Sequence, residues 1–136
     1  MVDPERLRRI LQRVSEDIGR LRRYERVDPE DILGDETRIG DLLRRFQTAL
    51  EGCIDAAQHV CASEGWGPPD SNAHAMLVLG QHAVVPRDLA EALADHARFR
   101  NVLVHLYAEV DVARAVARLS RLGELERYVA AVAELI

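Results

Sequence analysis

Four side chains that can take part in chemistry lie within one apolar segment: Arg100, Asn101, His105 and Tyr107. An arginine can hold a phosphate with a planar fork of donors. A histidine titrates near neutral pH and can take or give a proton. RNA supplies its own nucleophile, the 2′-hydroxyl, so this pair of residues suits cleavage of its phosphodiester bond. No metal ligand set is needed for such chemistry.

The helical geometry of the segment limits how a single copy can work. Each residue of an α-helix turns by roughly 100°, so Asn101 and His105 share one stripe. Arg100 and His105 lie about 140° apart around the helix axis. A straight helix therefore does not point both at one small target. A distorted helix end near His105, or a second subunit facing the first across a cleft, would bring them together.

The same residues also have structural interpretations, because an arginine and a histidine five positions apart occur often by chance. Arg100 can pair with an acid such as Asp95 or Glu109, and His105 can cap a helix. A buried Arg–Asn–His cluster can also fix the register of a purely structural dimer. The spacing alone leaves these alternatives open.

The composition indicates a single all-α domain over residues 1–136. Hydrophobic residues make up 48% of the chain and aromatic residues only 4%, a mixture poor in strand formers. No apolar run is long enough to span a membrane and the N-terminus lacks a signal core, so we expect a cytoplasmic protein. The net charge of −5 argues against a nucleic-acid partner, but the first 26 residues carry eight arginines and five acids. A local basic surface is therefore available.

Apolar periodicity and capping residues predict the helices that position the motif. A helix of about 20 residues follows Asp3, a short one follows Asp28, and a long one spans about 35–64. A short helix over about 73–79, one from Pro86 to near 107, and a last helix after Asp111 complete the chain. Short links imply antiparallel neighbours, so we expect an up-and-down bundle of four to five helices.

Other polar residues receive mainly structural interpretations. Asp55 and His59 are four apart on the long helix and can pair. Cys53 and Cys61 are about 12 Å apart on that helix, too far for a disulfide, and suit buried positions. No Cys/His spacing fits a metal site. The first helix also carries an arginine face, which is either solvated or in contact with RNA or an acidic partner: Arg8, Arg9, Arg13, Arg20, Arg22 and Arg23.

The segment 100–107, RNVLVHLY, resembles the Arg-x4-His-x-Tyr motif of the HepT-like toxins of the HEPN superfamily. The segment 50–60 is similar to the family's second-helix pattern, and the order of elements agrees over essentially the whole chain. The resemblance implies a HEPN-like bundle that dimerises, with two motifs lining one cleft. It also implies a metal-independent endoribonuclease toxin without a cofactor, in which Arg100 and His105 are catalytic and Asn101 supports them.

The resemblance further implies how such a toxin is silenced. The expected partner is a small MntA-like antitoxin with a minimal nucleotidyltransferase fold. It would transfer AMP from ATP to the motif tyrosine, here Tyr107. The added phosphate would then compete with the RNA phosphate for Arg100.

The residues just before the motif arginine depart from the family's pattern. Many members carry a Pro-Trp pair before the motif arginine, whereas residues 92–99 contain neither. His96, four residues before Arg100, either approaches the same phosphate or lies partly exposed on the helix.

A different class of function also stays open: a non-catalytic helical subunit that binds nucleotide or substrate for a nucleotidyltransferase partner. The intact Arg100, His105 and Tyr107 favour the toxin, because a binding subunit does not need all three.

Overall fold

Helices form every regular element of residues 2–105 and 110–136, the part of the chain that this computed structural model describes. The elements are α1 (Pro4–Tyr24), α2 (Pro29–Leu33), α3 (Glu36–Ser63), α4 (Asn72–Gln81), α5 (Arg87–His105), α6 (Val112–Ala117), the 3₁₀-helix η2 (Arg118–Arg121) and α7 (Leu122–Ala133). The prediction of an all-α bundle is confirmed. Tyr107 and the predicted end of the motif helix lie outside the described residues.

The helices begin where side chains cap their free backbone N–H groups. Asp3 accepts a hydrogen bond from the backbone N–H of Arg6 at 3.2 Å, at the start of α1. Asp111 does the same for the N–H of Ala113 at 3.1 Å, at the start of α6. Such caps stabilise a helix by about 1 kcal/mol each. Both predicted helix starts are confirmed.

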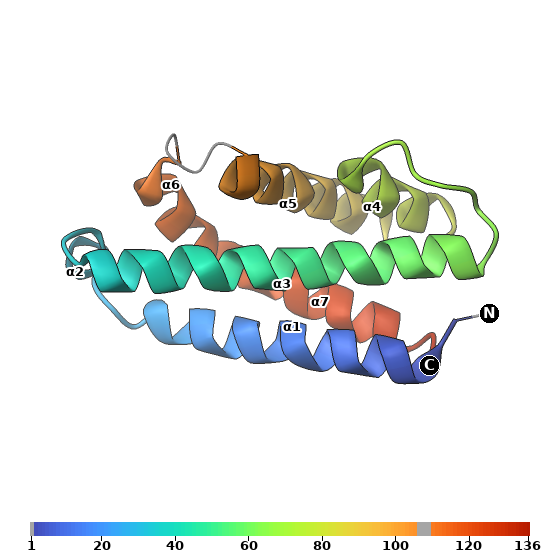
Figure 1. The fold of residues 1–136 in the computed structure, drawn as a ribbon, viewed down its shortest axis with the longest axis horizontal. Helices are drawn as coiled ribbons and strands as arrows, with labels where there is room; N and C mark the ends of the chain where they lie inside the picture. Colours follow the sequence, from blue (N-terminus) through green and yellow to red (C-terminus); the bar gives the residue numbers. More distant parts are fainter. Residues whose placement is uncertain (1, 106–109) are drawn as a thin grey trace.

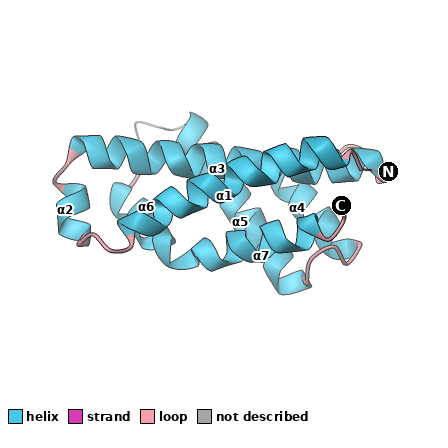
Figure 2. Cartoon of the chain, turned by 90° about the horizontal axis from the view of Figure 1, so that it is seen from below, coloured by secondary structure: helices cyan, strands magenta, loops and turns pink. Residues whose placement is uncertain are grey.

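The long helices α1, α3, α5 and α7 run in alternating directions along one axis (Figure 1), and α3 extends along most of the molecule. Two glycines allow neighbouring helices to approach closely. A Cβ atom on Gly52 of α3 would lie 2.5 Å from Val14 Cγ2 of α1, and one on Gly80 of α4 would lie 2.5 Å from Ala90 Cβ of α5. The α1–α3 and α4–α5 pairs are therefore held at short range. Figure 2 shows α6 at the same end of the bundle as α2, and the two helices are in contact.

The predicted last helix is interrupted, which the sequence analysis did not foresee. The chain passes from α6 through the 3₁₀ turn η2 into α7. Arg118 and Arg121, at the two ends of η2, both bind the carboxylate of Asp95 on α5, at 3.2 and 2.7 Å. These ion pairs join distant segments of the chain. The break in the last helix therefore coincides with tertiary contacts, and local helix propensity does not predict it.

One hydrophobic core contains residues from every helix. Tyr128 of α7 is its largest fully buried side chain, and the phenol donates a hydrogen bond of 2.8 Å to the backbone carbonyl of Cys53. Cys53 and Cys61 are free and buried, as predicted. Burial raises the pKa of the Cys53 thiol to about 12, so this thiol stays protonated and unreactive at neutral pH.

The predicted pairing of Asp55 with His59 is not found among the described residues. His59 Nε2 instead accepts the backbone N–H of Asp3 at 3.0 Å, which ties the start of α1 to the end of α3. This long-range contact uses the imidazole as an acceptor. Asp55 stays exposed on α3.

Candidate active site

Arg100 lies in the second-last turn of α5 with its side chain 23% exposed. Its Nη2 is 3.5 Å from Glu51 Oε1 on α3, and its Nη1 donates to Asn101 Oδ1 at 3.3 Å. The predicted ion pair between Arg100 and Asp95 is wrong, because the Asp95 carboxylate binds two other arginines. Glu109, the other candidate, lies outside the described residues.

A chain of amide hydrogen bonds holds Asn101 next to Arg100. Gln58 Nε2 of α3 donates to Asn72 Oδ1 at 3.0 Å, and Asn72 Nδ2 donates to Asn101 Oδ1 at 3.3 Å. Asn101 Oδ1 thus accepts from both Asn72 and Arg100. Its own amide N–H groups have no partner among the described residues, so they are available to an incoming phosphate oxygen.

The Arg100 guanidinium keeps donor capacity in reserve. Its Nε atom is buried and has no hydrogen-bond partner in the described part of the chain. The contact to Glu51 is long and joins two partly exposed groups, so it contributes little stability. A phosphate can therefore displace or share this carboxylate at small cost.

His105 is the last described residue of α5, and its side chain is exposed. No hydrogen bond or ion pair joins it to any described residue. The structure thus brings Arg100 and Asn101 into contact, whereas His105 makes no hydrogen bond to either. Among the described residues, nothing blocks the imidazole from a ligand.

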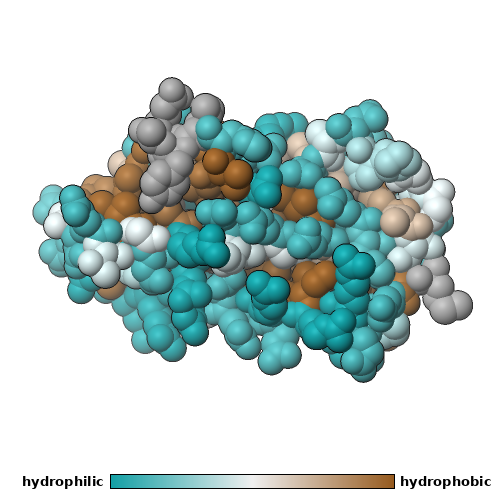
Figure 3. All heavy atoms as spheres, viewed as in Figure 1, coloured by the Kyte–Doolittle hydropathy of each residue, from teal (hydrophilic) through white to brown (hydrophobic). Residues whose placement is uncertain are grey.

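Glu51 and Asn72, which contact Arg100 and Asn101, were not predicted as site residues. One signal was present: polar residues recur at helical spacing on α3, outside its apolar stripe, at Gln47, Glu51, Asp55 and Gln58. In the space-filling view of the face over α3, hydrophilic side chains dominate, with hydrophobic patches toward α5 (Figure 3). The polar stripe of α3 is therefore one wall of the site.

Electrostatics along this wall are balanced between carboxylates and arginines. Burial, followed by the neighbouring Glu51 carboxylate, raises the pKa of Asp55. The charges of Arg6, Arg100 and Arg13 act in the opposite direction on that pKa. The acids of α3 therefore lie within the electrostatic reach of arginines on both α1 and α5.

His96 was predicted to be partly exposed or to approach the phosphate, and both expectations are wrong. Its side chain is 1% exposed, with Nε2 2.9 Å from Glu124 Oε1 and Nδ1 2.9 Å from Arg118 Nη2. Since arginine can only donate, Nδ1 accepts and Nε2 carries the proton. Burial, aided by the charge of Arg118, lowers the pKa of His96 to about 4. His96 is therefore a neutral structural link, not an acid or base at neutral pH.

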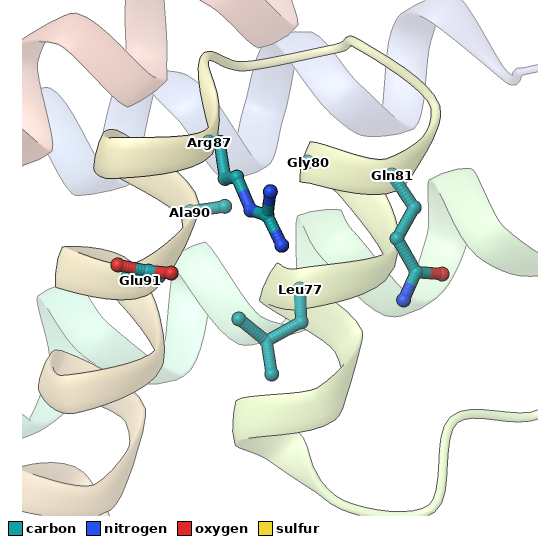
Figure 4. A pocket seen from close by; sticks show the side chains of 6 residues that line it. All are labelled: Leu77, Gly80, Gln81, Arg87, Ala90 and Glu91. Atoms are coloured by element: carbon teal, nitrogen blue, oxygen red, sulfur yellow. The ribbon is translucent and has the colours of Figure 1, made fainter.

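Two other features lie away from the motif. A hollow of about 420 Å³ opens between α4 and the first turns of α5 (Figure 4), where Arg87 extends beside Leu77. Arg87 precedes Arg100 by thirteen residues, or about 20 Å of helix, so this hollow is separate. Within residues 2–105 and 110–136, no group of three metal-ligating side chains is found, and no helix is long and apolar enough to cross a membrane.

The family follows from a comparison with known proteins. Residues 14–132 match the model of the family described as "Ribonuclease HepT-like". The helical bundle and the Arg-x4-His spacing at the end of α5 agree with this match. The chain belongs to the HepT-like family.

Individual relatives share the fold at low sequence identity. The mRNA nuclease HepT of Shewanella oneidensis is 24% identical over 106 residues, 78% of this chain and 74% of that protein. The tRNA nuclease HepT of Aphanizomenon flos-aquae is 24% identical over 110 residues, 81% of this chain and 75% of the relative. Among solved structures, a toxin–antitoxin complex with AMP-PNP matches with a TM-score of 0.84 and 22% identity, covering 97% of this chain and 99% of that one. The tri-AMPylated HEPN toxin of Shewanella oneidensis in complex with an MNT antitoxin matches with a TM-score of 0.85 and 22% identity, over 97% and 98% of the chains.

Proposed function

We propose that this chain is the toxin of a toxin–antitoxin pair and that it cleaves RNA as a metal-independent endoribonuclease. Arg100 and His105 are its catalytic residues, and Asn101 supports them. The carrying observation is the end of α5, where Glu51 and Asn101 hold a half-buried Arg100 and His105 is exposed without a hydrogen-bond partner among the described residues. Membership of the ribonuclease HepT-like family supports the proposal.

The proposed reaction uses the nucleophile of the substrate. The 2′-oxygen of RNA attacks the adjacent phosphorus, the bond to the 5′-oxygen breaks, and a 2′,3′-cyclic phosphate remains. Arg100 stabilises the charge that develops on the phosphoryl oxygens, and His105 takes the 2′-proton or gives one to the leaving oxygen. No cofactor enters this scheme.

A homodimer would place two motifs on one substrate. Arg100 and His105 point about 140° apart around the axis of α5, so one copy serves a single phosphate poorly. Val104, between them, is 37% exposed, and hydrophobic patches lie beside α5 in Figure 3. An apolar surface next to an incomplete site supports a subunit contact at this place.

The test of the proposed function is RNA cleavage by the purified protein in excess EDTA. We expect the same rate as with Mg²⁺, products that end in a 2′,3′-cyclic phosphate, and no cleavage where the 2′-hydroxyl is replaced by hydrogen. Loss of cleavage in EDTA would exclude the metal-independent mechanism. Nucleotide binding without any cleavage would instead favour the non-catalytic subunit.

We further propose that an antitoxin of the nucleotidyltransferase fold silences the toxin by transferring AMP to Tyr107. The Tyr107 oxygen would attack the α-phosphorus of ATP and release pyrophosphate. Two similar solved structures, a toxin–antitoxin complex with AMP-PNP and a tri-AMPylated toxin with its antitoxin, support this proposal. Tyr107 is two residues from His105 in sequence, so a phosphate attached to it adds negative charge close to the motif.

The variant Tyr107→Phe tests this mode of silencing. We expect Tyr107→Phe to keep its ribonuclease activity and to arrest growth even when the antitoxin is co-expressed, because the acceptor oxygen is absent. Mass spectrometry of the wild-type chain should show the mass of AMP on the peptide that contains residue 107. Full neutralisation of Tyr107→Phe would mean that the antitoxin acts by binding alone.

A further inference from the structure

A second hollow opens on another flank of the motif helix. It has a volume of about 330 Å³ and lies between the C-terminal half of α5 and the segment formed by α6 and η2. Its lining combines apolar groups, arginines and two carboxylates: Phe99, Val102, Val110, Arg98, Arg114, Arg118, Asp95 and Asp111. All of these belong to the described residues. We call this hollow the α5–α6 pocket.

The base of the α5–α6 pocket is held rigidly. The Arg118 guanidinium lies 4.3 Å from the centroid of the Phe99 ring. Its Nη2 also contacts Asp95 Oδ2 at 3.2 Å and His96 Nδ1 at 2.9 Å. Phe99 in turn meets Phe46 edge to face, with 5.7 Å between the ring centroids. Phe99 and Arg118 therefore form a fixed platform that needs no ordering when a ligand binds.

Arg98 lies on the same side of α5 as the exposed part of the motif. It precedes Asn101 by three residues and His105 by seven, so all three share one helical face. Arg98 is exposed and has no hydrogen bond or ion pair within the described chain. In contrast to Arg100, it therefore combines a free guanidinium with a position on the face of His105.

The charges around the pocket leave cations available. Asp95 is already bound by Arg118 and Arg121, and Asp111 caps α6 with its carboxylate. Arg114 contacts Asp111 only at 3.6 Å, with an 87% exposed side chain. Arg98 and Arg114 can thus turn to an anion, and Arg118 adds a buried Nε without a partner in the described residues.

An apolar base with arginines at its rim matches the two halves of a nucleotide. The nucleobase can pack on the apolar groups while the phosphate of the nucleotide binds the guanidinium groups. The volume of about 330 Å³ is at the lower end of the usual range for small-ligand pockets, which suits one nucleotide. A base within a duplex is stacked and paired, so only an unpaired nucleotide can enter.

We propose that the α5–α6 pocket binds one unpaired nucleotide of the RNA substrate next to the cleaved phosphodiester, and that Arg98 guides the strand from this pocket to His105. The inference rests on the proposed ribonuclease function and deepens it. It makes the substrate single-stranded at this position. Arg98 and Arg114 act in strand positioning and do not touch the reacting atoms.

The test compares Arg98→Ala and Arg114→Ala with Arg127→Ala. Arg127 is an exposed arginine of α7 that likewise has no ion pair in the described residues. A labelled single-stranded RNA with 2′-O-methyl groups reports the Kd without cleavage, and a cleavable RNA of the same sequence reports kcat and KM. We expect each pocket variant to raise Kd and KM about tenfold, with kcat within about twofold and a salt slope reduced by about 0.7. Arg127→Ala should match the wild type.

The outcomes separate this inference from the ribonuclease proposal. If the wild type binds the methylated RNA but cleaves nothing, the ribonuclease proposal fails, while the Kd values of the variants still decide on the pocket. The inference is overturned if both pocket variants bind RNA like Arg127→Ala. It is also overturned if blunt duplex RNA binds as tightly as single strands, or if Arg98→Ala weakens only antitoxin binding.

Discussion

Replacing His105 by alanine is expected to lower the rate of RNA cleavage by about 10²–10⁴-fold, the range that a positioned general acid or base contributes. The side chain is exposed and makes no hydrogen bond or ion pair with a described residue, so the folded state depends little on it. The melting temperature of His105→Ala should therefore stay within about 1–2 °C of the wild type, as for other neutral surface changes. A loss of activity without a loss of stability is the signature of a catalytic group.

Arg100 should behave differently from its neighbour on α5. Arg100→Ala removes the charge that stabilises the phosphoryl oxygens, at a cost of about 10²–10³ in rate. Arg100→Lys keeps the charge but loses the planar fork, so it should recover only part of the rate. Arg87→Ala, which removes an exposed arginine about 20 Å away at the other end of the same helix, is the control for the loss of an arginine from α5.

The measurements for these variants are multiple-turnover cleavage, growth arrest on expression, and thermal melting. Arg100→Ala and His105→Ala should relieve growth arrest while the oligomeric state persists. Continued toxicity of both variants would show that the catalytic assignment is wrong. A large drop in the melting temperature of His105→Ala would point to a structural role instead.

Acidification between pH 6.5 and about 4 is expected to destabilise the folded chain by about 3 kcal/mol through His96 alone. Burial, with the charge of Arg118 second, lowers the pKa of His96 from 6.5 to about 4 in the folded state. The unfolded chain therefore binds a proton across this window, and the folded chain does not. The contribution is complete above pH 6.5 and is lost as the pH falls toward 4.

Urea unfolding at pH 7, 6 and 5 measures this effect, with His96→Gln as the comparison. The variant should be less stable at pH 7, because Arg118 and Glu124 lose a buried partner. Its stability should nevertheless change little between pH 6.5 and 5. Asp95 and Glu124 have pKa values lowered by their arginine and histidine partners, so their titration falls below this window. An unchanged slope in His96→Gln would refute the role of His96.

Local signals in the sequence predict much of this fold. Asp3 and Asp111 precede periodic apolar residues and cap helices in the structure. Apolar spacing likewise predicts α3 to within a residue of its bounds, Glu36–Ser63. These features depend on neighbours within one helical turn. The interruption at η2 coincides with contacts to Asp95, more than twenty residues away, and no local pattern encodes such contacts.

The candidate site divides along the same line. The sequence shows the residue types and spacing of Arg100, Asn101 and His105, and the family resemblance predicts that they form an active site. The partner of Arg100 cannot be predicted from local sequence, because Glu51 lies 49 residues away on another helix. His96 was misjudged for a related reason: it lies three residues after Leu93 on the apolar stripe of α5, but its partners belong to η2 and α7, more than twenty residues away.

The carboxylate of Glu51 also has a consequence for substrate choice. It already satisfies part of the charge on Arg100, so in the free protein a lone phosphate or mononucleotide gains little by replacing it. A polynucleotide engages several cations at once, and each additional contact raises its effective concentration at the next. Long RNA chains would thus be favoured over abundant small anions of the cell, which meet Arg100 alone.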